Sequence, residues 1–323
     1  MTLIPIETKT DFLIAQQFVL QYEKVSATLA SLIRRNSENL VFITNSQNLT
    51  YSADETNSGV KNTILGILSL DYTLYHCIPE PDLLDATILA QELSALLKKP
   101  VRCISGEQKG TDFLVKVVSQ IDMSQYNNEL PKNSFLIPAQ SYYYKMMEFP
   151  AQNASGPLQN TYDSSQDVLH AHPIPASINL SGGEEIIRCT ENDMEFLHPL
   201  QKEYMKEEIA GPRKQITDAE VSIMLRQILK NQICLALLVD NEPVAKANTN
   251  AIGFNCVQIG GVFTHPLYRR NGYAAALVLS LCKRSIRANR QPVLFVKEKN
   301  LPAYTLYKKL GFTECGHYEI VYF

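Results

Sequence analysis

The sequence lacks any apolar run close to the ~18 residues that a membrane-spanning helix needs. Its first residues, MTLIPIETKTDF, lack the basic start and the apolar core of a signal peptide. Its seven cysteines are scattered singly without a C-x-x-C pair, which is typical of reduced thiols and argues against a disulfide framework or a zinc ribbon. These absences predict a cytoplasmic protein without membrane partners.

Composition argues against long disorder, a coiled coil and a collagen-like repeat, because 45% of the residues are hydrophobic and 20% are charged. The length of 323 residues allows two domains or one large one. Residues 151–183 are rich in Pro, Ser, Asn, Gln and Gly and have no apolar period, which predicts a linker. We therefore expect an N-terminal domain over 1–150 and a C-terminal domain over 184–323.

Apolar periodicity predicts α/β (α+β) architecture on both sides of this linker. Helical patterns cover 11–35, 81–98, 107–121, 192–208, about 217–230, 274–288 and 302–310. Strand patterns cover 39–44, 64–70, 72–78, 101–105, 135–147, 185–188, 233–239, 244–250, 257–263, 292–296 and 312–323. Thr217-x-x-Glu220 has the spacing of a capping box, in which each residue hydrogen-bonds the backbone of the other at a helix start.

Positive charge is concentrated in one stretch of the chain. Residues 261–310 carry ten Lys and Arg against one acidic residue, although the formal net charge of the whole sequence is −3. The N-terminal 150 residues are acidic on balance, which disfavours a nucleic-acid binder. This pattern predicts a local polyanionic ligand and no nucleic-acid partner.

The basic stretch begins where an apolar strand passes into Arg269-x-x-Gly272-x-Ala274 at a helix start. Backbone N–H groups at a helix start have no intrahelical partner and lie at the positive end of the helix dipole, so they bind phosphate oxygens. Gly272 and the small Ala274 allow close approach, and Arg269 and Arg270 add charged donors. The spacing is neither the dinucleotide-binding Gly-x-Gly-x-x-Gly nor a P-loop. A diphosphate fits this description.

A second motif follows about thirty residues later and opens another predicted helix. Together the two motifs resemble the GCN5-related N-acetyltransferase (GNAT) superfamily, whose phosphate loop Gln/Arg-x-x-Gly-x-Gly/Ala follows a strand that ends in a Pro-x-Tyr-Arg-like turn, here Pro266 to Arg269. The second family signature, Asn-x-x-Ala-x-x-Leu-Tyr-x-Lys-Leu-Gly-Phe, is matched at Asn300, Ala303, Leu306, Tyr307, Lys309, Leu310, Gly311 and Phe312. The resemblance covers roughly 184–323.

The resemblance implies a GNAT fold in 184–323, with a mixed, mostly antiparallel sheet flanked by helices, and acetyl-CoA as the acyl donor. It places the strand residues Val262, Phe263 and Thr264 beside the pantetheine arm and Asn300 against the cofactor arm. It assigns the diphosphate to Arg269, Arg270, Asn271, Gly272, Tyr273 and Ala274. Tyr307 would be the general acid that protonates the departing thiolate, and the other interpretation of Tyr307 is a half-buried helix aromatic. A phenol with a pKa near 10 suits that proton transfer.

The general base is not evident from the sequence. Several family members use a Glu on the strand before the loop, where this chain has Gln258, which cannot accept a proton. The remaining candidates are Glu207, Glu208, His265 and Glu319, each of which has a structural interpretation as well. An acceptor amine of low pKa would need no base.

Two further groups of residues carry weaker predictions. Lys283, Arg284 and Arg287 either meet the 3′-phosphate of the cofactor or complement the dipole at a helix C-terminus. His170 and His172 stand in the linker without a nearby Cys or carboxylate cluster, so we expect no metal.

The N-terminal half carries neither motif. Its element order resembles a degenerate, non-catalytic copy of the same fold, and the alternative is a plain α+β lid or dimerisation domain. The sequence thus predicts an N-acetyltransferase that moves an acetyl group from acetyl-CoA to an amine acceptor by direct attack, as a monomer or homodimer. The alternative is a catalytically inactive CoA-binding regulatory or interaction module.

Overall fold

The chain forms two compact units in a computed structural model that describes residues 1–45, 64–122, 140–150, 183–209 and 215–323. Unit 1 comprises Met1–Met146, Val296–Asn300 and Glu314–Phe323, and unit 2 comprises Met147–Phe295 and Leu301–Thr313. The predicted linker lies outside the described residues except for its last one, Gly183, and so do His170 and His172. The predicted C-terminal segment 184–323 therefore contributes strands to both units. Each helix in the described ranges is too short or too polar to cross a membrane.

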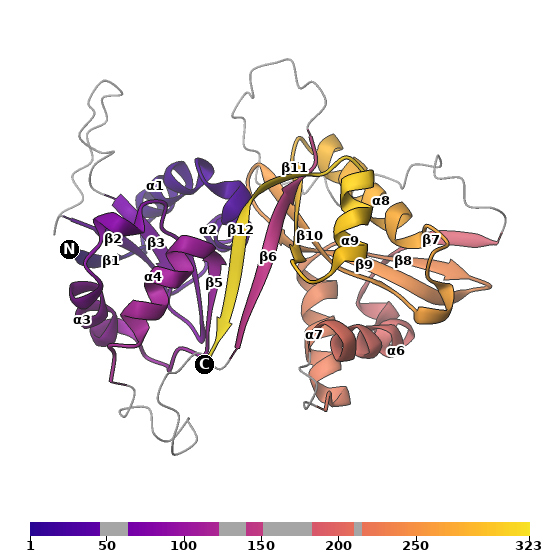
Figure 1. The fold of residues 1–323 in the computed structure, drawn as a ribbon, viewed down its shortest axis with the longest axis horizontal. Coiled ribbons are helices and arrows are strands. Elements are labelled where there is room, and N and C mark those ends of the chain that lie inside the picture. Colours follow the sequence, from indigo (N-terminus) through magenta and orange to yellow (C-terminus); the bar gives the residue numbers. More distant parts are fainter. Residues whose placement is uncertain (46–63, 123–139, 151–182, 210–214) are drawn as a thin grey trace. The chain divides into compact units, whose positions relative to one another are not determined.

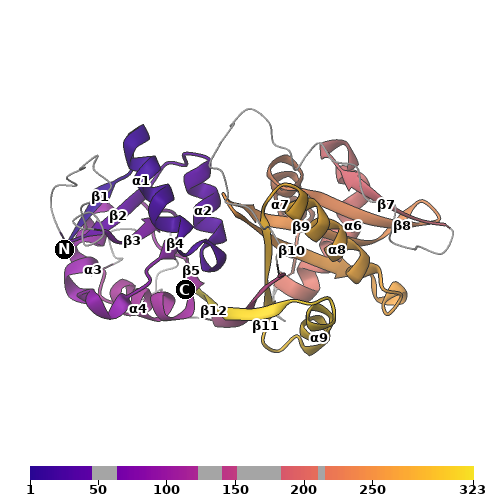
Figure 2. The ribbon, with the colours of Figure 1, turned by 90° about the horizontal axis from the view of Figure 1, so that it is seen from above.

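Unit 1 is a sheet between two pairs of helices. Its strands lie in the order β1-β2-β3-β4-β5-β12-β6, with β4 and β5 parallel and the other assigned pairs antiparallel. Figure 2 shows α1 and α2 on one side of the strands and α3 and α4 on the other. The elements are β1 Thr2–Pro5, α1 Lys9–Leu20, α2 Ala27–Arg34, β2 Leu40–Thr44, β3 Ile64–Ser69, β4 Thr73–Cys77, α3 Ala86–Leu96, β5 Cys103–Glu107, α4 Gln108–Val118, β6 Gln140–Glu148 and β12 Thr313–Tyr322.

Unit 2 contains strands in the order β11-β10-β9-β8-β7, among which only β10 and β11 are parallel in the assigned pairs. In Figure 1, α6 and α7 lie on one side of these strands and α8 lies on the other. The elements are β7 Glu184–Cys189, α6 Met194–Tyr204, α7 Asp218–Asn231, β8 Cys234–Val239, β9 Glu242–Ile252, β10 Cys256–Thr264, α8 Tyr273–Arg287, β11 Gln291–Lys297 and α9 Leu301–Lys309. The predicted mixed, mostly antiparallel α/β fold is confirmed.

Each unit has an apolar core between its helices and its sheet. In unit 1, Leu89 and Leu93 of α3 and Leu114 of α4 are fully buried against Leu68 and Leu74 of the strands. In unit 2, α6 and α7 bury apolar side chains against β7 and β8. Full burial of one such leucine contributes about 1.5–3 kcal/mol, so the helical periodicity in the sequence is explained by these faces.

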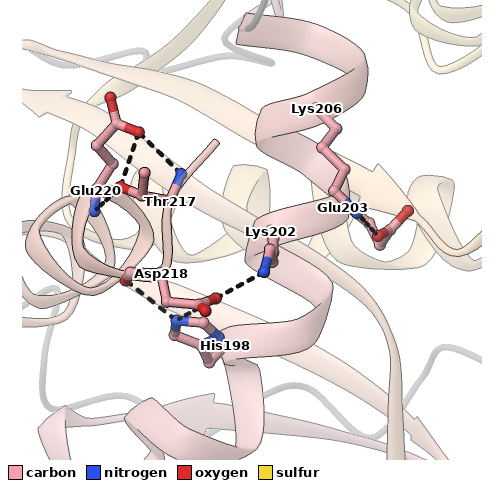
Figure 3. Close-up of polar contacts among 7 residues, drawn as sticks. All are labelled: His198, Lys202, Glu203, Lys206, Thr217, Asp218 and Glu220. Atoms are coloured by element: carbon pink, nitrogen blue, oxygen red, sulfur yellow. Dashed lines mark hydrogen bonds and ion pairs between the residues drawn. The ribbon is translucent and has the colours of Figure 1, made fainter. Parts of the chain in front are cut away.

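The start of α7 is fixed by the predicted capping box, shown in Figure 3. The Thr217 hydroxyl accepts from the Glu220 N–H at 3.3 Å, and the Glu220 carboxylate accepts from the Thr217 N–H at 2.9 Å. The next residue, Asp218, joins α7 to α6 because its carboxylate accepts from Lys202 Nζ at 2.7 Å. The Lys202–Asp218 pair thus links α6 to α7, which lie on the same side of the unit 2 strands.

The described elements of the chain repeat one order twice, apart from single helical turns. The first copy runs β1-α1-α2-β2-β3-β4-α3-β5-α4-β6 and the second runs β7-α6-α7-β8-β9-β10-α8-β11-α9-β12. The last strand of the second copy pairs with a strand of the first, since β12 is antiparallel to β5 from Tyr318↔Glu107 to Tyr322↔Cys103. The N-terminal half thus shares the element order of the C-terminal half.

The structure departs from the predicted elements at a few points. Strand β1 was not expected, and the periodic segment 11–35 is divided into α1 and α2. The helix predicted from Pro81 begins at Ala86 instead, because the Asp85 carboxylate caps it by accepting from the N–H groups of Thr87 and Ile88. The helix predicted over 192–208 ends its regular part at Tyr204 and continues as a π-helical turn over Met205–Ile209.

Candidate active site

Strand β10 extends beyond its pairing with β11. The parallel register runs from Cys256↔Gln291 to Ile259↔Leu294, whereas β10 continues to Thr264. Beyond Ile259, the assigned partners of β10 in the described chain lie on β9 alone. The backbone of the predicted cofactor residues Val262, Phe263 and Thr264 therefore lies where β10 no longer pairs with its parallel neighbour.

The end of β10 carries an unsatisfied polar group. The Thr264 hydroxyl oxygen is buried and has no hydrogen-bond partner among the described residues. A buried hydroxyl without a partner costs free energy, so this position suits a ligand that brings a polar atom. This observation fits a cofactor arm along the last residues of β10.

The turn after β10 leads directly to the start of α8. The His265 ring accepts from the Leu267 N–H at 3.4 Å, and the chain reverses through Pro266–Tyr268. Gly272 is the N-cap of α8 at φ +82°, and no side chain caps the helix. The first N–H groups of α8 therefore keep their capacity for an anion. Nothing lies within 4 Å of where a Cβ on Gly272 would be, so the backbone angle requires glycine here and available space does not.

Arg269 is already engaged on both sides. Its Nε donates to the Thr264 carbonyl oxygen at 3.0 Å, and its Nη2 donates to Glu207 Oε2 at 2.6 Å. The guanidinium also lies 5.7 Å from the ring centroid of Phe263. Arg269 thus ties the predicted phosphate loop to the end of β10 and to the π-helical turn after α6, and its role toward a diphosphate stays a prediction.

The other predicted loop residues differ in exposure. Arg270 is exposed and has φ +69°, and Asn271 Nδ2 donates to the Tyr268 carbonyl oxygen at 3.2 Å. Tyr273 is only 8% exposed, and its hydroxyl donates to Glu184 Oε1 at 3.1 Å. The Tyr273 side chain is therefore used in packing α8 against the start of β7, which leaves its backbone N–H for the predicted anion site. Ala274 is half-buried in the first turn of α8.

Tyr307, on α9, is nearly buried. Its ring centroid is 5.9 Å from that of Phe312. Burial raises the pKa of the Tyr307 phenol, and the nearby Glu208 and Tyr204 raise that pKa further. The phenol therefore keeps its proton at neutral pH, as a proton donor must.

The candidate bases lie in different places. Glu207 pairs with Arg269, whereas Glu208 is the carboxylate of the set whose charge acts on Tyr307. Gln258 is buried within β10, opposite Ala251 of β9 and Val293 of β11. Glu319 belongs to unit 1.

The other positions with a predicted role are Asn300 and the basic residues near the end of α8. Asn300 groups with unit 1, immediately before α9, and its N–H donates to the Lys297 carbonyl oxygen at 2.8 Å. Arg284 is 3% exposed, so it faces the interior, in contrast to the exposed Arg287. Within the described ranges, no group of three or more His, Cys, Asp or Glu side chains is arranged to hold a metal ion.

Sequence reasoning missed Lys246, which is fully buried on β9. Its Nζ donates to the Gly261 carbonyl oxygen at 3.0 Å, beside the predicted cofactor residues of β10. The signal available in the sequence is a lysine inside the apolar run V-A-K-A, together with the pair Gly260-Gly261 inside the otherwise apolar β10. A lysine is almost never fully buried unless it is paired.

Comparison with known proteins identifies the domain that holds this site. Residues 195–312 match the family model described as the acetyltransferase (GNAT) family. These residues form a GNAT domain. The description of this family names acetyl transfer as its chemistry. The match includes the end of β10, the loop before α8 and α9.

Solved structures add a likeness along the whole chain. A Drosophila protein solved as a structural genomics target is 13% identical, covers 98% of this chain and 91% of its own, and has a TM-score of 0.50. A GNAT-family acetyltransferase from Colwellia psychrerythraea is 10% identical, covers 100% and 99%, and has a TM-score of 0.47. The Drosophila structure shows that the fold extends beyond the GNAT domain to nearly the whole chain.

Another similar structure is a putative GNAT-family acetyltransferase from Novosphingobium aromaticivorans, 18% identical with a TM-score of 0.37. It covers 57% of this chain, and this chain covers 65% of it, slightly less than two thirds. No curated protein matches the chain.

Proposed function

We propose that the chain is an N-acetyltransferase that transfers the acetyl group of acetyl-CoA to an amine acceptor by direct attack. The observation that carries the proposal is the continuity of β10 with α8: a strand that leaves its parallel partner runs, through one turn, into an uncapped helix start. This arrangement offers backbone groups to an extended arm and N–H groups to a diphosphate. In this proposal, Val262, Phe263 and Thr264 bind the arm and 269–274 bind the diphosphate.

The proposed reaction needs a polarised carbonyl and two proton transfers. The amine nitrogen attacks the thioester carbon, and N–H groups of β10 stabilise the negative charge that develops on the carbonyl oxygen. The C–S bond then breaks, and Tyr307 gives its proton to the thiolate. Glu208 is the proposed base that receives the proton of the amine. Among the candidate bases, it is the one whose carboxylate is near enough to Tyr307 to raise the pKa of the phenol. A cationic amine must lose a proton before it can attack.

The proposal is tested by binding and turnover in sequence. Acetyl-CoA affinity is measured by calorimetry, and thiol release is then followed with a panel of amines that includes small polyamines, amino acids and lysine peptides. We expect micromolar to submillimolar affinity and turnover with a subset of the panel. Absence of acetyl-CoA binding would contradict the proposal.

A second candidate function is a CoA-binding module without turnover. The observation that favours it is Gln258, which is buried within β10 and has an amide where several GNAT enzymes have a carboxylate base. Tight acetyl-CoA binding without thiol release on any amine of the panel would support this alternative.

The N-terminal half is proposed to be a non-catalytic copy of the same fold. The helix that corresponds to α8 in the repeated order is α3, and its start is already occupied by the Asp85 carboxylate, which accepts from the Thr87 N–H at 2.8 Å and from the Ile88 N–H at 3.0 Å. A fixed negative charge at this position opposes a diphosphate.

A further inference from the structure

Lys246 is a buried lysine whose amino group hydrogen-bonds two neighbouring residues. Its side chain is 0% exposed, and Nζ donates to Asn248 Oδ1 at 3.1 Å and to the Gly261 carbonyl oxygen at 3.0 Å. Nζ also lies 4.7 Å from the ring centroid of Tyr204. No carboxylate in the described part of the chain forms an ion pair with it. Burial lowers the pKa of the Lys246 amine. Burying this group without a carboxylate partner is costly, which calls for a functional explanation.

The carbonyl that Lys246 binds belongs to a bulge in β10. The register with β9 shifts between Gly260↔Asn248 and Phe263↔Lys246, so Gly261 and Val262 stand opposite a single residue of β9. Gly261 has φ +56°, and a Cβ there would lie 1.9 Å from Asn248 Oδ1. The bulge therefore requires glycine, and Lys246 and Asn248 fix it from β9.

The bulge controls the direction of one N–H group. No described peptide bond is cis, so the Val262 N–H points away from the Gly261 carbonyl oxygen and hence away from Lys246. A hydrogen bond donated to a peptide oxygen polarises the peptide and makes its N–H a stronger donor. The proposed function places Val262 beside the pantetheine arm and assigns N–H groups of β10 to the thioester carbonyl oxygen.

We propose that Lys246 is a positioning residue for acyl transfer: its amino group holds the Gly261 carbonyl by a hydrogen bond, and so orients and strengthens the Val262 N–H as the donor to the thioester carbonyl oxygen. This inference rests on the proposed function. Lys246 does not contact the substrate in this role, because its Nζ is enclosed by Gly261, Asn248 and Tyr204. It acts through the peptide that it binds.

The test uses Lys246→Met, which keeps the apolar stem and removes the amino group, and Lys246→Gln, which keeps an N–H donor. Lys230→Met, at an exposed position of α7, is the matched control. Acetyl-CoA carrying ¹³C at the carbonyl carbon is bound to each protein, and its affinity, kcat and carbonyl stretching frequency are measured. The stretching frequency reports polarisation of the thioester carbonyl. If Lys246 contributed to folding stability alone, its loss would leave that frequency unchanged in a folded protein.

We expect Lys246→Met to bind acetyl-CoA within about threefold of the parent, to lose about 10- to 100-fold in kcat, somewhat less than the loss of a whole oxyanion donor, and to shift the stretch toward that of free acetyl-CoA. Lys246→Gln should give a smaller change in the same direction. Unchanged kcat and stretch in a folded Lys246→Met protein would overturn the inference. Absence of acetyl-CoA binding by the parent protein would overturn the proposed function as well.

A second variant covers the case in which neither lysine variant folds. Gly261→Ala combined with Asn248→Ala leaves room for the new Cβ and keeps Lys246, but it disturbs the bulge at its positive φ. We expect the same loss in kcat and the same shift of the stretch. Parent values for both quantities in this protein would contradict the inference.

Discussion

Asp85 and Gly272 hold the same position in the two copies of the repeated element order, and they have opposite effects on it. Each is the N-cap of the helix that follows the fourth strand of its copy. The Asp85 carboxylate accepts from two N–H groups of α3, whereas Gly272 leaves the start of α8 without a side-chain cap. One helix start is thus satisfied from within the chain, and the other can receive an anion.

The first prediction concerns Gly272. Gly272→Asp should lower acetyl-CoA affinity at least about 100-fold, or about 2.7 kcal/mol. The new side chain is strained at φ +82° by about 1–2 kcal/mol, and its carboxylate competes for the N–H groups of α8. Calorimetry measures the change.

The matched control for Gly272 is Asp85→Ala. It should cost about 0.5–2 kcal/mol of stability through loss of the α3 cap and leave acetyl-CoA affinity unchanged. Equal affinities of Gly272→Asp and the parent protein would show that the diphosphate binds elsewhere.

The second prediction concerns the proposed general acid. Tyr307→Phe should lower kcat by about 100-fold or more with little change in acetyl-CoA affinity. Because burial raises the pKa of the phenol, loss of its proton should not limit the parent rate up to its ordinary value near 10. Single-turnover kinetics across pH 6–10 measure both effects. Tyr304→Phe on the same helix is the control, and an unchanged chemical step in Tyr307→Phe would exclude the acid role.

The third prediction concerns the pair between Glu207 and Arg269. Glu207→Gln removes the carboxylate at 2.6 Å and releases the guanidinium for the diphosphate. Because half-exposed ion pairs contribute about 0–1 kcal/mol, we expect affinity for acetyl-CoA to rise about two- to fivefold at low salt. Glu203→Gln, one turn earlier on α6, should have no such effect. A weaker affinity in Glu207→Gln would instead indicate that the pair holds the loop in its binding form.

The fourth prediction concerns the base. Glu208→Gln should lower kcat, and the loss should grow with the pKa of the acceptor amine because a more basic amine more often needs deprotonation. The measurement is kcat for a series of amines of similar size and different pKa. A loss that is uniform along the series would point to a structural effect.

The fifth prediction concerns the stability of unit 1. His76 is buried, and burial lowers its pKa from 6.5 to about 3. In the unfolded chain His76 therefore binds a proton near pH 6.5, whereas in the folded chain it binds one only near pH 3. The free energy of unfolding should consequently fall as pH falls, by about 1.4 kcal/mol per pH unit between 6.5 and 3. Urea titrations at pH 7 and 5 compare the parent with His76→Gln, whose dependence on pH should be shallower. If the free energy of unfolding changed equally with pH in both proteins, the low pKa assigned to His76 would be contradicted.

Most secondary structure could be predicted because its causes are local. The apolar period of α8 and the capping box at Thr217 depend on residues within one or two helical turns. Strand β1 was missed because it is only four residues long, and the helix start at Ala86 was misplaced because Pro81 is an equally suitable first residue. In such short segments, the local preferences of the residues allow more than one position for the start of an element.

The candidate site divides in the same way. The sequence alone determined that a strand, a turn that contains Gly272 and a helix start follow one another, because these are neighbours along the chain. Only the tertiary structure decided that Lys246 binds the carbonyl of Gly261 fifteen residues away, that Arg269 pairs with Glu207 at a separation of 62 residues, and that β12 pairs with β5. Such contacts depend on how whole elements pack, which no local pattern of residues specifies.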